Sequence, residues 1–228
     1  ILICPQQGKG VVNGSSRKLE LKPVTAKNGK QTITGKIEAW GEIGLAIKAY
    51  DYMDNTTNIY GVKDITLRQD SQIIYHSNLD RFAFDETRYL NSYVDYEEWK
   101  DRRSFYMRSF VEPGNRLRFN ESVNRGIIHI GEEKTYHLTY TLSDAFGNTT
   151  RLSVWIEGKE QEIPEIETEG TELFHWMSDN RFGAKGIRMT IPKGNLYDDL
   201  YFRYSVKEDS TALADTHICL LYTSDAAD

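Results

Sequence analysis

The feature that most constrains the fold is a strict alternation of apolar and polar residues in two neighbouring segments, 135–143 and 149–156. The apolar members of this alternation are Tyr136, Leu138, Tyr140, Leu142, Leu152, Val154 and Ile156. A period of two places them on one face of half-buried β-strands. Between the segments, Asp144 can close an Asx-turn and Gly147 can adopt a positive φ, so the sequence predicts a β-hairpin.

Further short alternating segments predict that the rest of this region is also built from strands. They fall at residues 19–24, 31–37, 43–52, 65–68, 72–76 and 81–84. Short strands separated by turn residues at this spacing are typical of a β-sandwich rather than of alternating strands and helices. The sequence therefore predicts an all-β fold, with an Ig-like β-sandwich over residues 1–157.

The alternation is missing from about residue 85 to residue 112. This segment is predicted to be a short helical insertion on the sandwich. Asp95 followed by Glu98 has the pattern of a capping box, which predicts a short helix that ends near Arg103. The tyrosines spaced for one face of such a helix are Tyr89, Tyr93 and Tyr96.

A change of composition predicts a domain boundary after the sandwich. Residues 158–170 are acidic, poor in apolar residues and contain Pro164, as in an extended linker. New strands are expected at residues 172–177, 187–191 and 200–206. Because roughly 50 residues are marginal for an independent core, residues 171–218 are predicted to be an incomplete second β domain.

The final segment has a different character. Residues 219–228 resemble the translation of a transposon-type sequencing adaptor, and the chain begins at Ile1 rather than at Met. We expect residues 219–228 to be an adaptor-derived artefact, and the chain to be a fragment of a longer gene, so this segment is excluded from the fold prediction.

Composition excludes some classes of partner. The net charge is -6, and -4 without Asp225 and Asp228, which argues against nucleic acid because phosphate binding requires a basic face. The mean hydropathy is -0.57 and no run of about 18 apolar residues occurs, so no membrane span is predicted. Without a second native cysteine, Cys4 is expected to be a small buried thiol.

No motif predicts a reaction or a metal site. The histidines are His76, His129, His137, His175 and His217, and no two have the H-x-H or H-E-x-x-H spacing of zinc ligands. The G-x-S-x-G and Walker patterns are absent. We therefore predict no catalytic residue and no metal ligand in this chain, and an independent hydrolase is the least favoured hypothesis.

One cluster has the composition of a binding surface. Its predicted binding residues are Tyr93, Tyr96, Trp99, Arg102 and Arg103. Aromatic rings stack on sugars or on partner proteins, and arginine is enriched at interfaces. The alternative interpretation is that these rings only cover the sandwich.

Five segments carry a resemblance to a known family. They are residues 44–51 (GLAIKAYD), 84–89 (FDETRY), 95–98 (DYEE), 123–126 (VNRG) and 144–148 (DAFGN). The stretch 43–156 that contains them resembles the region following the peptidase module in a group of bacterial LytM/lysostaphin-type zinc endopeptidases. The last segment also resembles the D-x-x-G-N hairpin of bacterial Ig-like domains.

The resemblance implies a role outside catalysis. Family members hydrolyse peptide cross-bridges, usually of peptidoglycan, with a zinc ion held by an H-x-x-x-D segment and an H-x-H segment, and we expect neither segment in this chain. It therefore implies a non-catalytic accessory module of a cell-envelope enzyme, with zinc only in an upstream peptidase module. Expected partners are that module and peptidoglycan or an envelope protein. The alternative function is a glycan- or protein-binding module that uses the aromatic and arginine cluster.

Overall fold

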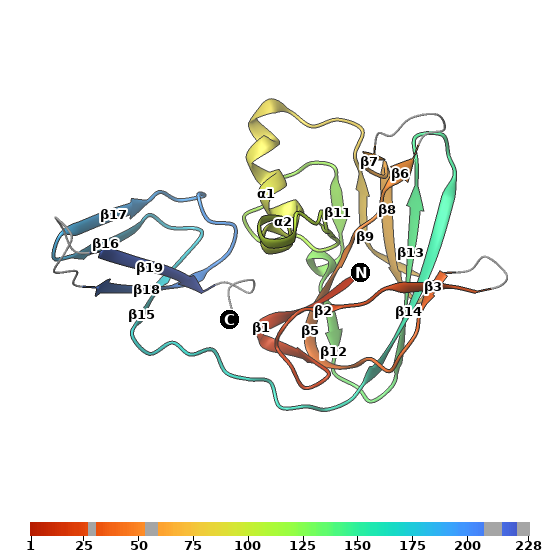
Figure 1. Ribbon diagram of the computed structural model, residues 1–228, viewed down its shortest axis with the longest axis horizontal. Helices are drawn as coiled ribbons and strands as arrows, with labels where there is room; N and C mark the ends of the chain where they lie inside the picture. The colour runs from red at the N-terminus through yellow and green to blue at the C-terminus, as the bar shows by residue number, and fades with distance from the viewer. Residues whose placement is uncertain (27–30, 53–58, 208–215, 223–228) are drawn as a thin grey trace. The chain divides into compact units, whose positions relative to one another are not determined.

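The computed structural model describes residues 1–26, 31–52, 59–207 and 216–222 (Figure 1). The chain divides into two compact units. The amino-terminal unit comprises residues 1–111 and 115–164, and the carboxyl-terminal unit comprises residues 112–114 and 165–228.

Strands dominate the amino-terminal unit. Their bounds are β1 Leu2–Val12, β2 Leu19–Glu20, β3 Pro23–Thr25, β4 Gln31–Ile33, β5 Glu38–Ile47, β6 Asp51–Tyr52, β7 Ile59–Tyr60, β8 Asp64–Gln69, β9 Gln72–Asn78, β10 Met107–Arg108, β11 Asn120–Ser122, β12 Ile128–Ile130, β13 Thr135–Ser143 and β14 Thr149–Gly158. In the described part, one large sheet has the order β11-β9-β8-β13-β14-β5-β1-β2, and β6 pairs separately with β7.

The predicted hairpin is confirmed. β13 and β14 are antiparallel partners in unbroken register from Thr135↔Glu157 to Ser143↔Thr149. At the turn, Asp144 Oδ1 accepts hydrogen bonds from the backbone N–H groups of Phe146 and Asn148 at 2.8 and 2.9 Å. The sequence was sufficient to predict this hairpin because both of its signals are local. The turn residues reverse the chain, and the period-two pattern decides which face of the strands is buried.

The large sheet curls around one hydrophobic core (Figure 1). The core joins inward-facing residues from strands distant in the chain, such as Ile3, Leu67 and Ile156, which are 0–1 % exposed. Two tyrosines lie deep within it and keep their hydroxyls bonded: Tyr75 donates to Asn120 Oδ1 at 2.9 Å, and Tyr140 donates to Ser109 Oγ at 2.8 Å. The fold is all-β with a short helical insertion.

The insertion contains separate short helices instead of one continuous face. They are the 3₁₀-helix η1 Phe84–Tyr89, α1 Leu90–Tyr93 and α2 Tyr96–Arg102, with a further 3₁₀ turn η2 at Asn124–Gly126. Val94 and Asp95 have extended backbone angles, which interrupts the helix between α1 and α2. The prediction that Tyr89, Tyr93 and Tyr96 share one helical face is therefore wrong.

Two strand predictions also differ from the structure. Residues 81–84 form no strand, because the Glu86 carboxylate accepts the Ala83 N–H at 2.7 Å and starts η1 instead. Strand β1 was not predicted, since Pro5 and four nearby glycines or glutamines obscure the alternation. The register between β1 and β5 shifts between Pro5 and Gly10, which accommodates this irregular sequence as a bulge.

The carboxyl-terminal unit contains two small sheets. β15 Thr171–Phe174, β18 Leu200–Lys207 and β19 Thr216–Tyr222 form one, and β16 Asn180–Ala184 pairs with β17 Ile187–Ile191 in the other. Its core is formed by Phe174, Leu200 and Phe202. β19 pairs with β18 as far as Tyr222; this pairing does not test the origin of residues 219–228, so the adaptor hypothesis stays a prediction.

No helix in the described ranges is long and apolar enough to cross a membrane. This finding agrees with the absence of a long apolar run in the sequence.

Candidate binding surface on helix α2

Helix α2 is defined at both ends by local interactions. At its start, Asp95 Oδ1 accepts the Glu98 N–H at 3.2 Å, which is the N-cap half of the predicted capping box. At its end, Arg103 has a left-handed backbone with φ 53°, and its N–H bonds to the Trp99 carbonyl at 3.0 Å. These two turns of helix present Tyr96, Trp99 and Arg103 at helical spacings of three and four residues.

These three side chains form a contiguous group, called here the α2 surface. The Tyr96 and Trp99 rings have centroids 5.8 Å apart and are tilted by 37°. The Arg103 guanidinium lies 4.8 Å from the Trp99 centroid, in cation–π geometry. Tyr96 is 54 % exposed, so this group borders solvent in the amino-terminal unit.

The structure buries Tyr93 away from this group and pairs the exposed side chain of Arg102 with two carboxylates. Tyr93 is only 5 % exposed and packs edge-to-face against Phe119 with centroids 5.3 Å apart. Arg102 bonds to Glu20 at 3.2 Å and to Glu98 at 3.5 Å. The break at Val94 and Asp95 rotates Tyr93 into the core, which sequence spacing could not reveal.

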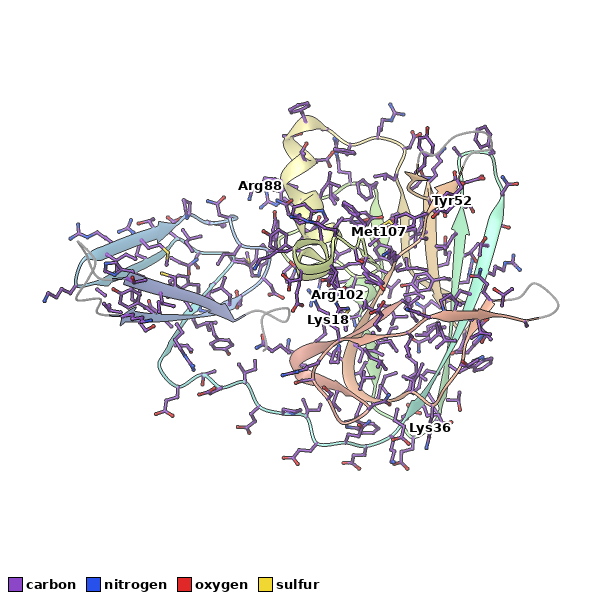
Figure 2. The ribbon with its side chains drawn as sticks, viewed as in Figure 1. Lys18, Lys36, Tyr52, Arg88, Arg102 and Met107 are labelled. Carbon is purple, nitrogen blue, oxygen red and sulfur yellow. The ribbon has the colours of Figure 1, made fainter. Side chains whose placement is uncertain are left out.

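A buried charge cluster anchors α2 to the sheet. Lys18 Nζ lies 2.9 Å from Asp95 Oδ2 and 2.8 Å from Glu97 Oε2, and Arg108 Nη2 lies 3.4 Å from Asp95 Oδ2. Lys18 and Arg102 are both labelled near α2 in Figure 2. Burial alone would raise the pKa of Asp95, but the two cations outweigh it and hold the pKa below its usual value. Asp95 is therefore an ionised structural anchor.

A second hydrogen bond connects the segment after α2 to β2. The Tyr106 hydroxyl donates to Glu20 Oε1 at 2.8 Å, and this bond lowers the pKa of Glu20. Burial raises the pKa of Glu98, which lies beside Arg102. Glu20 and Glu98 thus both have structural partners, Tyr106 and Arg102 for the first and Arg102 for the second.

The structure places Cys4 in the core, as predicted. Cys4 is 3 % exposed, and burial raises the pKa of its thiol to about 12. The reactive form of cysteine is the thiolate, so this thiol is inert at neutral pH.

Two histidines are each paired with one carboxylate. The prediction that the H-x-x-x-D spacing is absent is wrong, because this spacing occurs at His76–Asp80 and His175–Asp179. In the structure, however, His76 Nε2 lies 2.7 Å from Asp64 and His175 Nδ1 lies 3.1 Å from Asp199. Within the described residues, no three His, Cys, Asp or Glu side chains are grouped as a metal site.

A cleft that the sequence did not predict lies at one end of the large sheet. It has a volume of about 380 Å³ and is lined by residues from several separate segments, including Ile47, Tyr50, Asp51 and Leu142. Asp144 also lines it, but its oxygens accept bonds within the β13–β14 turn. The oxygens of Asp144 are thus used to hold the turn.

Comparison with known proteins gives one match. The model of the Zu5-like domain matches residues 171–220, which are 50 of the 228 residues. No curated protein and no solved structure matches the chain. The matched segment begins at Thr171, the first residue of β15, and ends within β19. The carboxyl-terminal unit is thus similar to a Zu5-like domain.

Proposed function

We propose that this chain is a non-catalytic accessory module of a bacterial cell-envelope zinc metalloendopeptidase of the peptidoglycan hydrolase type, and that it positions the peptidase module. The proposal rests on the resemblance of residues 43–156 to accessory sequence. The observation that carries it is that the polar residues of the resembling segments are used to hold the sheet and its insertion together, as expected of a scaffold.

Glu86, in the segment 84–89, is the clearest example. Its carboxylate accepts bonds from Arg118 Nε at 2.8 Å and from Arg118 Nη2 at 3.0 Å, besides the Ala83 N–H at 2.7 Å. The bidentate pair ties η1 to the chain before β11. These bonds hold the pKa of Glu86 down to about 2, so the group stays ionised and is unsuited to proton transfer near neutral pH.

The segments 95–98 and 123–126 also make bonds that hold the structure together. Asp95 caps α2 and pairs with Lys18 and Arg108. In the turn at 123–126, the Arg125 carbonyl accepts the Val111 N–H at 2.8 Å. Both segments therefore hold the insertion against the sheet. The segments that carry the resemblance thus include residues that stabilise the fold.

Under this proposal the chain has no activity of its own and belongs to the cell envelope, while zinc belongs to the peptidase module of the same protein. The test is to recover the uninterrupted gene with long reads and to translate the region upstream of Ile1. Paired H-x-x-x-D and H-x-H segments are expected there. An upstream sequence without them would overturn the link to the peptidase.

A second candidate function is favoured by the composition of the α2 surface. Tyr, Trp and Arg are the residues most enriched at protein-binding hot spots. Arg103 lies against the Trp99 ring and adds a charged group to the aromatic pair, so the α2 surface has the composition of a protein-binding hot spot. Docking of the peptidase module, or of an envelope protein, would give the accessory module its positioning role.

This docking is tested with the complete chain and the peptidase module encoded by the same gene. Trp99→Ala should weaken their association in a calorimetric titration, because it removes the centre of the α2 surface. Lys100→Ala, which changes an exposed residue of the same helix, is the matched control. Equal affinity of both variants would show that the α2 surface is not the contact.

A further inference from the structure

A second exposed aromatic group lies on the outer face of the β13–β14 hairpin. His137 and Trp155 are direct partners in the antiparallel register. Their rings are stacked, with centroids 3.9 Å apart and planes inclined by 18°. Trp155 is 51 % exposed, although its strand neighbours Val154 and Ile156 on the opposite face are fully buried.

The stack holds the indole in a fixed position. A regular nine-pair ladder orders the backbone beneath it, and the imidazole covers one face of the indole. An exposed tryptophan held in this way loses little conformational entropy when a ligand binds. Single exposed apolar side chains are common on protein surfaces and do not by themselves indicate a binding site. Here, by contrast, two stacked rings hold each other in a fixed orientation.

Trp155 lies at a break in the sheet. On the side away from β13, β14 pairs with β4 as far as Ser153 and with β5 from Glu157 onwards. Among the described residues, no strand pairs with Trp155 on that side. The indole, which is 51 % exposed, therefore has no strand directly beside it there.

The residues next to the ring pair on this face are polar. Thr135 and Thr139 flank His137 on β13, and Ser153 and Glu157 flank Trp155 on β14. Arg68 of β8 is the register partner of Thr139, so the nearest charged residues are one of each sign. These neighbours favour a neutral ligand that is rich in hydroxyl groups over an apolar helix or a polyanion.

We propose that Trp155, backed by His137, is a stacking platform for a pyranose ring of a neutral glycan chain. The negative face of an aromatic ring attracts the C–H groups on one side of a sugar ring. The surrounding hydroxyls, with Arg68, supply partners for the sugar hydroxyls. This site is separate from the α2 surface, and the inference does not depend on the proposed link to a peptidase.

The test uses the complete chain and a panel of neutral hexasaccharides: chitohexaose, cellohexaose and maltohexaose. Binding is measured by isothermal titration, and the tryptophan fluorescence is recorded in the same samples. At least one member of the panel should bind, and Trp155→Ala should weaken it about tenfold or more, in proportion to the loss of one ring stack. Trp155→Phe should retain part of the affinity, and Lys100→Ala, at an exposed position, should leave it unchanged.

Other outcomes would overturn the inference. A wild-type chain that binds none of the three oligosaccharides has no neutral glycan site of this kind. Equal binding by Trp155→Ala would place the site elsewhere, once an unchanged thermal melt shows that this variant is folded. If Trp155→Ala instead weakens association with the peptidase module, the platform is a protein interface. Because Trp99→Ala reports on the α2 surface, failure of this inference is distinguishable from failure of the proposed function.

Discussion

Arg108 Nη2 lies 3.4 Å from Asp95 Oδ2, and the two side chains are only 2 % and 0 % exposed. The same carboxylate caps α2 and pairs with Lys18 at 2.9 Å. One buried anion thus connects β10, the chain before β2 and the helix that carries the α2 surface. The position of this surface depends on an ion cluster whose members are far apart in the sequence.

Asp95→Ala should destabilise the amino-terminal unit strongly. Removing one partner of a buried ion pair leaves uncompensated charge, which costs about 3–5 kcal/mol. The free energy of unfolding in urea is the measurement. Asp101→Ala, at an exposed position of the same helix, should change it by less than about 0.5 kcal/mol. Similar values for the two variants would contradict the structural role of Asp95.

The Glu86–Arg118 pair should make stability dependent on acid pH. The folded pKa of Glu86 is depressed to about 2, below an ordinary unfolded value of about 4.3. Its contribution is therefore complete above about pH 4.5 and is lost as the pH falls through the folded pKa. Glu86→Gln should destabilise the protein at pH 7, and this cost should shrink between about pH 4.5 and pH 2.

The measurement for this pair is a series of urea unfolding curves across that pH range. Glu121→Gln, at an exposed position, is the control and should show little difference from the wild type at any of these pH values. A cost for Glu86→Gln that is constant from pH 7 to pH 2 would show that the carboxylate charge is not what stabilises η1.

Two tyrosines three residues apart should respond very differently to truncation. Tyr93 is 5 % exposed and packs against Phe119, so Tyr93→Ala should cost roughly 3–5 kcal/mol, as for other buried aromatic residues. Tyr96 is 54 % exposed, and Tyr96→Ala should cost less than about 1 kcal/mol. Thermal and urea unfolding of both variants decide this. Comparable losses would restore the single helical face that the sequence predicted.

Two glycines separate backbone strain from close packing. Gly126 and Gly147 both have positive φ, 77° and 90°, so alanine should cost about 1–2 kcal/mol at either position. At Gly126 the added methyl group would also collide with the Ser109 carbonyl oxygen, whereas at Gly147 it meets open space. Gly126→Ala should therefore be the more destabilising variant in urea unfolding. The reverse order would show that the η2 turn is not packed against Ser109.

The sequence by itself determined the all-β class and the β13–β14 hairpin. It also determined the N-cap of α2, because Asp95 and the Glu98 backbone are three residues apart and interact locally. Period-two alternation, turn residues and helix caps all act over a few neighbouring residues, so they can be recognised without the tertiary structure. The burial of Cys4 followed in the same way from its residue type.

Only the tertiary structure decided which side chains meet across distant segments. It moved Tyr93 into the core, paired Arg102 with Glu20, and left Tyr96, Trp99 and Arg103 together. It also connected Asp95 with Lys18, whose positions are 77 residues apart in the sequence. Such contacts arise from chain reversal and sheet curling, which bring together residues that no local pattern relates.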